Sequence, residues 1–98
     1  MTAAREEFLE TGFEAPHSDL ERSVAVILAD VLGVDRVGRE DSFYDFNGTS
    51  LQAIRICTRI EAQLGIPAEP YWLFSEDVLK DFAARLAKQG AVQIEGVR

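Results

Sequence analysis

Apolar residues recur at helical spacing in three stretches of the chain, and the first stretch begins just after Pro16. Ser18 and Glu21 have the spacing of a capping box, in which each side chain accepts a hydrogen bond from the other residue's backbone N–H. Gly33 follows the last apolar position, and glycine is common just after a helix because it readily adopts the left-handed conformation. The pattern therefore predicts a first helix over residues 19–32. Its apolar stripe consists of Leu20, Val24, Ile27, Leu28 and Val31.

The second stretch predicts a helix over residues 50–64. A helical wheel at about 100° per residue gathers its core positions on one face. Leu51 lies opposite this face and Ile54 lies on its flank, so we expect both side chains to be partly exposed to solvent. Large apolar side chains that stay exposed near each other indicate a surface that docks a partner. The core face consists of Ala53, Ile56, Cys57, Ile60 and Leu64.

Two further helices are predicted toward the end of the chain. Pro70 can start a short helix over residues 71–74, because the missing backbone N–H of proline is harmless at the first helical position. Ser75 is expected to cap a longer helix, which we expect to end at Gly90. The buried face of this longer helix consists of Val78, Leu79, Phe82, Ala83 and Leu86.

Together these elements predict an all-α fold, an antiparallel bundle of three main helices plus one short helix. A long loop over residues 33–49 joins helices one and two, and we expect Phe43 and Phe46 to pin it to the core. We divide the chain into a flexible N-terminal arm (residues 1–17), one domain (residues 18–89) and a flexible C-terminal tail (residues 90–98).

Composition narrows the classes of function. The formal net charge is −7, and it falls entirely within residues 1–50, which makes nucleic-acid binding unfavourable because phosphate contacts need clustered Lys and Arg. The sequence has neither a long apolar run nor a signal peptide, so we expect a cytoplasmic monomer without a membrane span. A single cysteine, Cys57, and a single histidine, His17, argue against a disulfide and a zinc site.

Ser50 is the candidate site of chemistry, because it stands where the long loop meets the second helix. Asn47 and Gly48 can adopt the positive φ angles of a tight turn, and serine is favoured at a helix N-cap or in the first turn. A serine hydrolase is disfavoured, since the one imidazole, His17, lies in the arm and no glycine elbow surrounds Ser50. We interpret Asp41 as a turn-capping residue that serves no pocket.

The segment FYDFNGTSL, residues 43–51, resembles the phosphopantetheine-attachment motif of the acyl and peptidyl carrier proteins, F-F-x-L-G-G-x-S-L. The following AIRICTRI and the later LFSEDVLKDFA are also similar to segments of this family. Asn47 replaces the first glycine of the motif, and Thr49 stands where Asp or His usually precedes the serine. Asp77 and Val78 replace the Pro-Thr pair before the last helix.

The resemblance implies a carrier that catalyses no reaction itself, with 4′-phosphopantetheine attached to Ser50 and with Gly48, Thr49 and Leu51 around the attachment point. Leu51, Ile54 and Arg55 would dock partner enzymes. The implied partners are a phosphopantetheinyl transferase, an adenylation or acyl-loading enzyme, and condensation, ketosynthase, tailoring or thioesterase enzymes.

Helix two distinguishes the types of carrier within this family. Fatty-acid carriers share a strongly acidic second helix, whereas Arg55 and Arg59 outnumber Glu61 here, which favours a peptidyl carrier of non-ribosomal peptide or hybrid polyketide biosynthesis. Because the sequence starts at Met and ends soon after the last helix, we expect a free-standing protein. Two alternatives stay open, an unmodified carrier-like interaction module and a fatty-acid or polyketide acyl carrier.

Overall fold

The computed structural model describes residues 2–96, and for residues 91–96 it describes the backbone only. Helices account for every regular element in this range, which confirms the predicted all-α fold of three long helices and one short one. Two 3-10 helices, η1 and η2, were not expected. The elements are η1 Arg5–Glu7, α1 Asp19–Leu32, η2 Phe43–Phe46, α2 Ser50–Leu64, α3 Trp72–Ser75 and α4 Leu79–Gly96.

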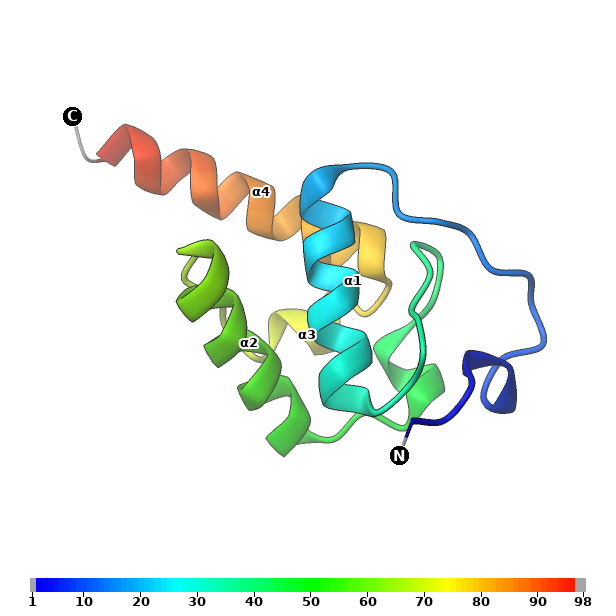
Figure 1. Ribbon diagram of the computed structural model, residues 1–98. Helices are drawn as coiled ribbons and strands as arrows, with labels where there is room; N and C mark the ends of the chain where they lie inside the picture. Colours follow the sequence, from blue (N-terminus) through cyan, green and yellow to red (C-terminus); the bar gives the residue numbers. More distant parts are fainter. Residues whose placement is uncertain (1, 97–98) are drawn as a thin grey trace.

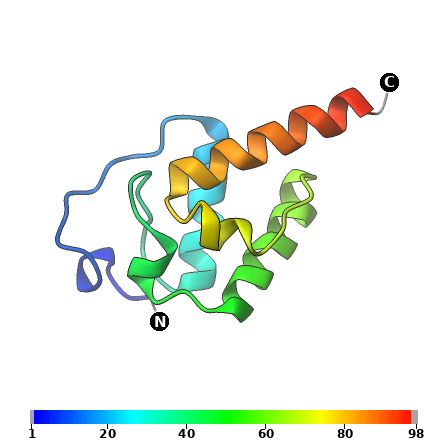
Figure 2. The same ribbon diagram turned by 180° about the vertical axis from the view of Figure 1, so that it is seen from behind.

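The long helices α1 and α2 lie side by side and run in opposite directions (Figure 1). Helix α4 crosses behind α1 in Figure 1 and contacts α1 and α3, and its C-terminal end projects beyond the rest of the molecule (Figures 1 and 2). The core lies between these helices and takes Phe43 and Phe46 from the loop, as predicted. Its largest fully buried apolar side chains are Phe43, Phe82, Ile27, Leu28, Ile56, Ile60, Leu73, Leu79 and Leu86.

Helix α1 begins and ends where the sequence predicts. The Ser18 hydroxyl accepts the N–H of Glu21 at 3.0 Å, and Gly33 ends the helix at φ 74°. The Glu21 carboxylate reaches back one residue further than a capping box does, and accepts the N–H of His17 at 2.9 Å. It also pairs with Arg39 of the long loop at 3.0 Å, so the start of α1 is tied to that loop.

The boundaries of the C-terminal helices differ from the prediction at two residues. Ser75 does not cap α4 but is the last residue of α3, and its hydroxyl bonds to Tyr71 and Glu76. Gly90 does not end α4, which continues to Gly96. A glycine inside a helix costs only about 1 kcal/mol, and no proline follows to stop the helix.

The described part of the N-terminal arm also differs from the flexible segment that we expected. Residues 5–7 form η1, and Arg5 is completely buried. Helix propensity alone is too weak to order so short a segment, but contacts with a loop that lies distant in the sequence hold the arm in place. The division of the chain at residues 17 and 90 stays a prediction.

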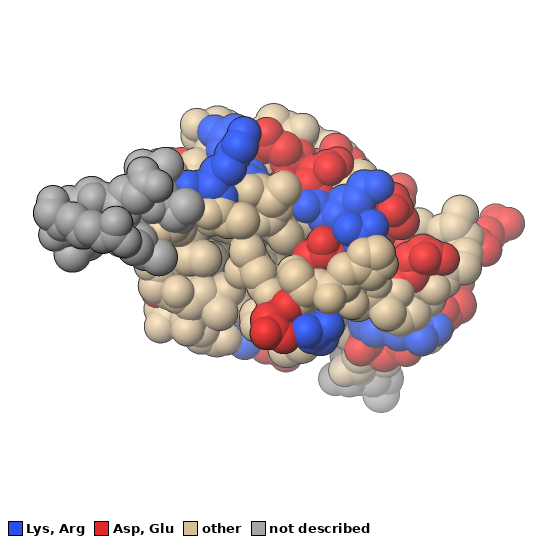
Figure 3. All heavy atoms as spheres, turned by 90° about the horizontal axis from the view of Figure 1, so that it is seen from above, with Lys and Arg blue, Asp and Glu red and all other residues tan. Residues whose placement is uncertain are grey.

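Charged side chains of both signs share the surface. Figure 3 shows Lys and Arg scattered among Asp and Glu on the face seen from above. Several acidic residues of the first half pair with basic ones, such as Glu40 with Lys80 at 2.9 Å. Among the described residues, no helix is long and apolar enough to cross a membrane.

Candidate functional site

Ser50 is the first residue of α2, and it is exposed to solvent. Helix α2 begins where the long loop ends (Figure 1). Asn47 lies three residues before Ser50 and is the C-cap of η2, where it adopts the left-handed conformation at φ 57°. Asparagine tolerates this conformation better than most residues that carry a Cβ atom. The prediction of a positive φ at Asn47 is therefore confirmed.

Thr49, and not Ser50, is the N-cap of α2. The Thr49 hydroxyl accepts the N–H of Gln52 at 3.2 Å, and the Gln52 side chain accepts the N–H of Thr49 at 2.9 Å. A helix start leaves four N–H groups without an intrahelical acceptor, and this capping box satisfies two of them. The N–H groups of Ser50 and Leu51 have no acceptor among the described residues. The Ser50 hydroxyl is thus not needed for capping and lies beside two available donors.

The sequence predicts that Gly48 adopts a positive φ, but the structure shows that a glycine is required here for space. Its φ is not positive, but a Cβ atom at this position would lie 2.3 Å from the ring of Phe43. That distance is far inside van der Waals contact. The glycine therefore lets the backbone before Ser50 pass directly over a buried aromatic ring.

The loop that leads to Ser50 is fixed to α3 and to the start of α4. The Phe43 ring packs edge-on against Phe74 at 5.8 Å between centroids, and the Tyr44 hydroxyl donates to the Phe74 carbonyl at 2.9 Å. The Phe43 N–H donates to the carbonyl of Asp77 at 2.8 Å. The Ser42 hydroxyl donates to the carboxylate of the same Asp77.

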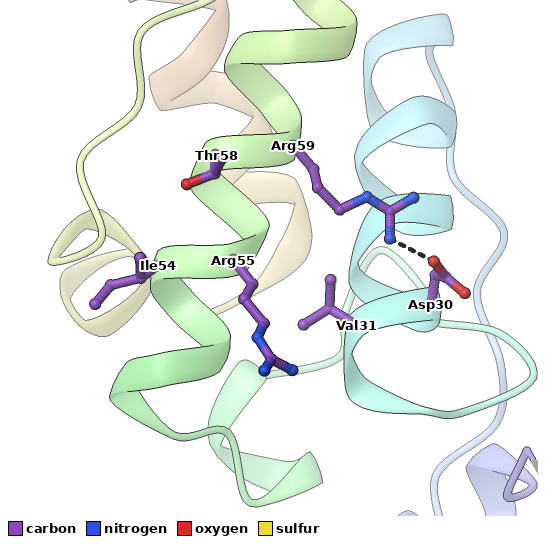
Figure 4. A pocket seen from close by; sticks show the side chains of 6 residues that line it. All are labelled: Asp30, Val31, Ile54, Arg55, Thr58 and Arg59. Carbon is purple, nitrogen blue, oxygen red and sulfur yellow. Dashed lines mark hydrogen bonds and ion pairs between the residues drawn. The ribbon is translucent and has the colours of Figure 1, made fainter.

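Leu51 and Ile54 are exposed by 58% and 50%, which confirms their placement on the helical wheel. Arg55 is exposed beside them, and its side chain extends toward α1 (Figure 4). A shallow groove of about 400 Å³ runs over this part of α2 and the end of α1. At one edge of the groove Arg59 pairs with Asp30 (Figure 4). The groove is lined by Asp30, Val31, Ile54, Arg55, Thr58 and Arg59.

Cys57 lies on the opposite face of α2 and is buried, as predicted. Burial raises the pKa of its thiol to about 12, and the negative charges of Glu61 and Glu69 act in the same direction. A thiol with so high a pKa is almost entirely protonated at neutral pH, so it is a poor nucleophile. Cys57 therefore serves the core.

Sequence reasoning missed a buried ion pair in the loop that leads to this site. Arg5 Nε lies 2.6 Å from Asp41 Oδ2, and the side chains of both residues are almost fully buried. Asp41 also accepts the N–H of Gly38 at 2.7 Å, so its predicted role in a turn is correct but incomplete. The two residues lie 36 positions apart, and no local pattern in the sequence links them.

Comparison with known proteins identifies the family of the chain. The model of the family described as phosphopantetheine attachment site matches residues 22–86, a segment that includes Ser50. The chain belongs to this family. It is a carrier domain for phosphopantetheine, and such a domain is acted on by partner enzymes.

Curated relatives of this carrier domain are large synthetases. Malpibaldin synthetase of Mortierella alpina is 36% identical over 84 residues, which are 86% of this chain and 2% of that protein. Tyrocidine synthase 2 of Brevibacillus parabrevis is 34% identical over 85 residues, which are 87% of this chain and 2% of that protein. The chain thus spans about 2% of the length of these relatives.

A solved structure of similar fold contains a carrier together with its modifying enzyme. A chain in the complex of the phosphopantetheine transferase Sfp with coenzyme A and a peptidyl carrier protein superposes with a TM-score of 0.72 at 26% identity. The superposition covers 78% of this chain and 99% of that chain. The fold of the carrier domain described here is therefore that of a protein which a transferase binds.

Proposed function

We propose that this chain is a peptidyl carrier protein that holds its cargo on a 4′-phosphopantetheine arm attached to Ser50. The thiol at the end of this arm holds an aminoacyl, peptidyl or acyl group as a thioester. The process served would be non-ribosomal peptide biosynthesis or its hybrid with polyketide biosynthesis, in keeping with the synthetases to which the chain is similar.

The observation that carries the proposal is the exposed Ser50 hydroxyl beside two free backbone N–H groups at the start of a fifteen-residue helix. A phosphodiester on this oxygen would lie at the positive end of the helix dipole, which contributes about 0.3 to 1 kcal/mol at an exposed site. The capping box of Thr49 and Gln52 leaves those N–H groups available. The first turn of α2 holds no acidic residue that would repel the phosphate.

The attachment reaction requires little of the carrier itself. The Ser50 oxygen would form the new bond to phosphorus, the pyrophosphate bond of coenzyme A would break, and adenosine 3′,5′-bisphosphate would leave. The transferase would supply the magnesium ion, and it would also supply the base that takes the hydroxyl proton. The carrier contributes the presentation of the oxygen, for which Gly48 allows the close approach of the backbone and Thr49 fixes the helix start.

Partner enzymes would dock on the exposed face of α2 that starts at Ser50. Leu51 and Ile54 offer apolar area, and Arg55 adds a positive charge next to them. A surface this small suits a weak and exchangeable contact, as a carrier that visits several enzymes requires. We expect a phosphopantetheinyl transferase, a loading enzyme and a condensation or thioesterase enzyme to share it.

The charge of α2 supports the peptidyl type over the fatty-acid type. Arg55 and Arg59 extend from the exposed side of the helix, and Arg59 is paired with Asp30 of α1 (Figure 4). Basic side chains there would repel a partner with a basic docking surface. A fatty-acid or polyketide acyl carrier is therefore the second choice.

Intact-mass spectrometry tests the proposal. The protein is incubated with coenzyme A, magnesium and several transferases of different specificity, and the expected result is a mass gain of one phosphopantetheine. Ser50→Ala should abolish this gain. The matched control, Ser75→Ala, removes another exposed serine of a helix and should leave it intact.

The alternative from another class is an interaction module that is never modified. The departures from the family motif at Asn47 and Thr49 motivate it, because both residues are exposed close to Ser50, where a transferase would read the surface. No mass gain with any transferase would favour this module. A gain that persists in Ser50→Ala would refute the assignment of the site.

A further inference from the structure

The N-terminal arm is attached along the loop that leads to Ser50. The Ala3 N–H donates to the carbonyl of Gly33 at 2.8 Å, and the Asp35 N–H donates back to the carbonyl of Ala3 at 2.9 Å. Further along, the Arg39 N–H donates to the carbonyl of Glu14 at 2.8 Å. Two separate parts of the arm thus bond to the backbone of the loop.

Arg5 is the centre of this attachment. Its Nε and Nη2 donate to the two carboxylate oxygens of Asp41 at 2.6 and 2.7 Å, a bidentate pair. Its Nη1 and Nη2 donate to the carbonyls of Thr11 and Gly12 at 2.9 and 3.3 Å. The guanidinium therefore joins the turn of the arm to the loop, and it does so with no exposure to solvent.

Asp41 connects Arg5 to the segment that leads to Ser50. Its carboxylate accepts the N–H of Gly38, and its backbone carbonyl accepts the N–H of Leu79 at the start of α4 at 3.0 Å. The next residue, Ser42, is the N-cap of η2, and η2 ends at Asn47. The arm also contacts η2 itself, where Phe8 packs on Phe46 at 5.6 Å between ring centroids.

We propose that Arg5 is a positioning residue for Ser50, and that its ion pair with Asp41 holds residues 38–48 in the arrangement that the transferase reads. This inference rests on the proposed function and extends it, because it places a residue outside the segment matched by the family model in the recognition of the carrier. A buried pair of this kind is sensitive to the loss of one partner, since the remaining charge stays buried without compensation.

The kinetic consequence follows from the population of the ordered loop. If the transferase binds only molecules with the ordered loop, the apparent affinity falls in proportion to their fraction. Once the carrier is docked, the loop is ordered and the chemical step proceeds as before. Loss of the Arg5 contact should therefore raise KM for the carrier and leave kcat nearly unchanged.

The test compares Arg5→Met and Arg5→Lys in the full chain, at a temperature where circular dichroism shows each variant fully folded. A loop that is ordered in about a tenth of the molecules predicts a rise of about tenfold in KM for Arg5→Met, with kcat within about twofold. Arg5→Lys keeps the charge but loses the bidentate geometry, so an intermediate KM is expected. Arg85→Met is the matched control, because Arg85 pairs with Glu76 and packs over Trp72, and KM should not change.

Hydrogen exchange supplies a readout that does not depend on the transferase. Amides of residues 38–48 should exchange at close to their unprotected rates in Arg5→Met, because a loop that is ordered in only about a tenth of the molecules gives almost no protection, while the buried part of α2 keeps its rates. Unchanged KM together with unchanged exchange would overturn the inference. A wild-type protein that no transferase modifies would instead refute the proposed function, and exchange would still report whether Arg5 orders the loop.

A milder variant covers the case in which Arg5→Met does not fold. Phe8→Ala removes the contact of the arm with η2 and leaves no buried charge behind. It should raise KM by about twofold to threefold, which corresponds to an ordered fraction of a third to a half. If Phe8→Ala has the KM and the exchange rates of the wild type, the arm does not position Ser50.

Discussion

Replacing Gly48 by alanine tests whether the approach of the backbone to Phe43 sets the geometry before Ser50. A Cβ atom at this position would lie 2.3, 2.4 and 2.5 Å from the Cζ, Cε1 and Cε2 atoms of Phe43. Carbon atoms in contact are about 3.5 to 4.0 Å apart, so either the ring or the backbone must move by more than about 1 Å. The ring has little room to move, because it is 1% exposed and packs against Phe74.

The expected cost of Gly48→Ala follows from this overlap. Forcing an extra methyl group into a packed core destabilises a protein by about 1 to 3 kcal/mol. For a domain of this size, each kcal/mol lowers Tm by about 4 to 8 °C. Modification of Ser50 should also slow, because the displaced segment leads directly to the helix start.

Thermal unfolding followed by circular dichroism measures the effect. Gly12→Ala is the matched control, since no atom lies within 4 Å of a Cβ at Gly12, and its Tm should stay close to that of the wild type. Adding Phe43→Leu to Gly48→Ala should restore part of the lost stability if the two side chains clash, and a double-mutant cycle measures this coupling. An unchanged Tm in Gly48→Ala would refute the reasoning.

Three further predictions concern other parts of the molecule. Leu51→Asp should impair loading by partner enzymes without loss of helicity. The control Val26→Asp, at a similarly exposed apolar position on α1, should leave loading unchanged. A loading rate equal to the wild type in Leu51→Asp would contradict the docking face. Because burial raises the pKa of Cys57 to about 12, Ellman's reagent should find no thiol in the native apo-protein, one after unfolding, and one in the native modified protein. Hydrogen bonding from Arg39 lowers the pKa of Glu21. The ionised Glu21 therefore stabilises the fold above the ordinary pKa of about 4.3, and this contribution is lost as the pH falls through the lowered value. Tm should fall less steeply with acid in Glu21→Gln than in the wild type.

Local patterns were sufficient to predict most of the fold. The stripe and caps of α1 gave its bounds, and the wheel of α2 separated buried Ile56 from exposed Leu51. These signals work because a helix repeats its environment every turn, so that neighbouring residues report the same face. The candidate serine emerged from the same kind of local pattern.

Long-range contacts were what local patterns could not supply. The pairing of Arg5 with Asp41 depends on two segments that meet only in the folded chain. Likewise, Gly48 could be identified as a turn residue, but the ring of Phe43 beneath it became visible only in three dimensions. At Gly90 a local rule gave the wrong answer, because one glycine is a weaker signal than the helix-forming residues around it.

The attachment of phosphopantetheine to the Ser50 oxygen is the central claim, and peptide mapping by tandem mass spectrometry tests it most directly. Cleavage after Arg39 and Arg55 releases one peptide that contains Ser42, Thr49 and Ser50. After incubation with coenzyme A, magnesium and a transferase, fragment ions should place one phosphopantetheine on Ser50. A group on the neighbouring Thr49 or on Ser42, or a peptide left unmodified by every transferase, would contradict the claim.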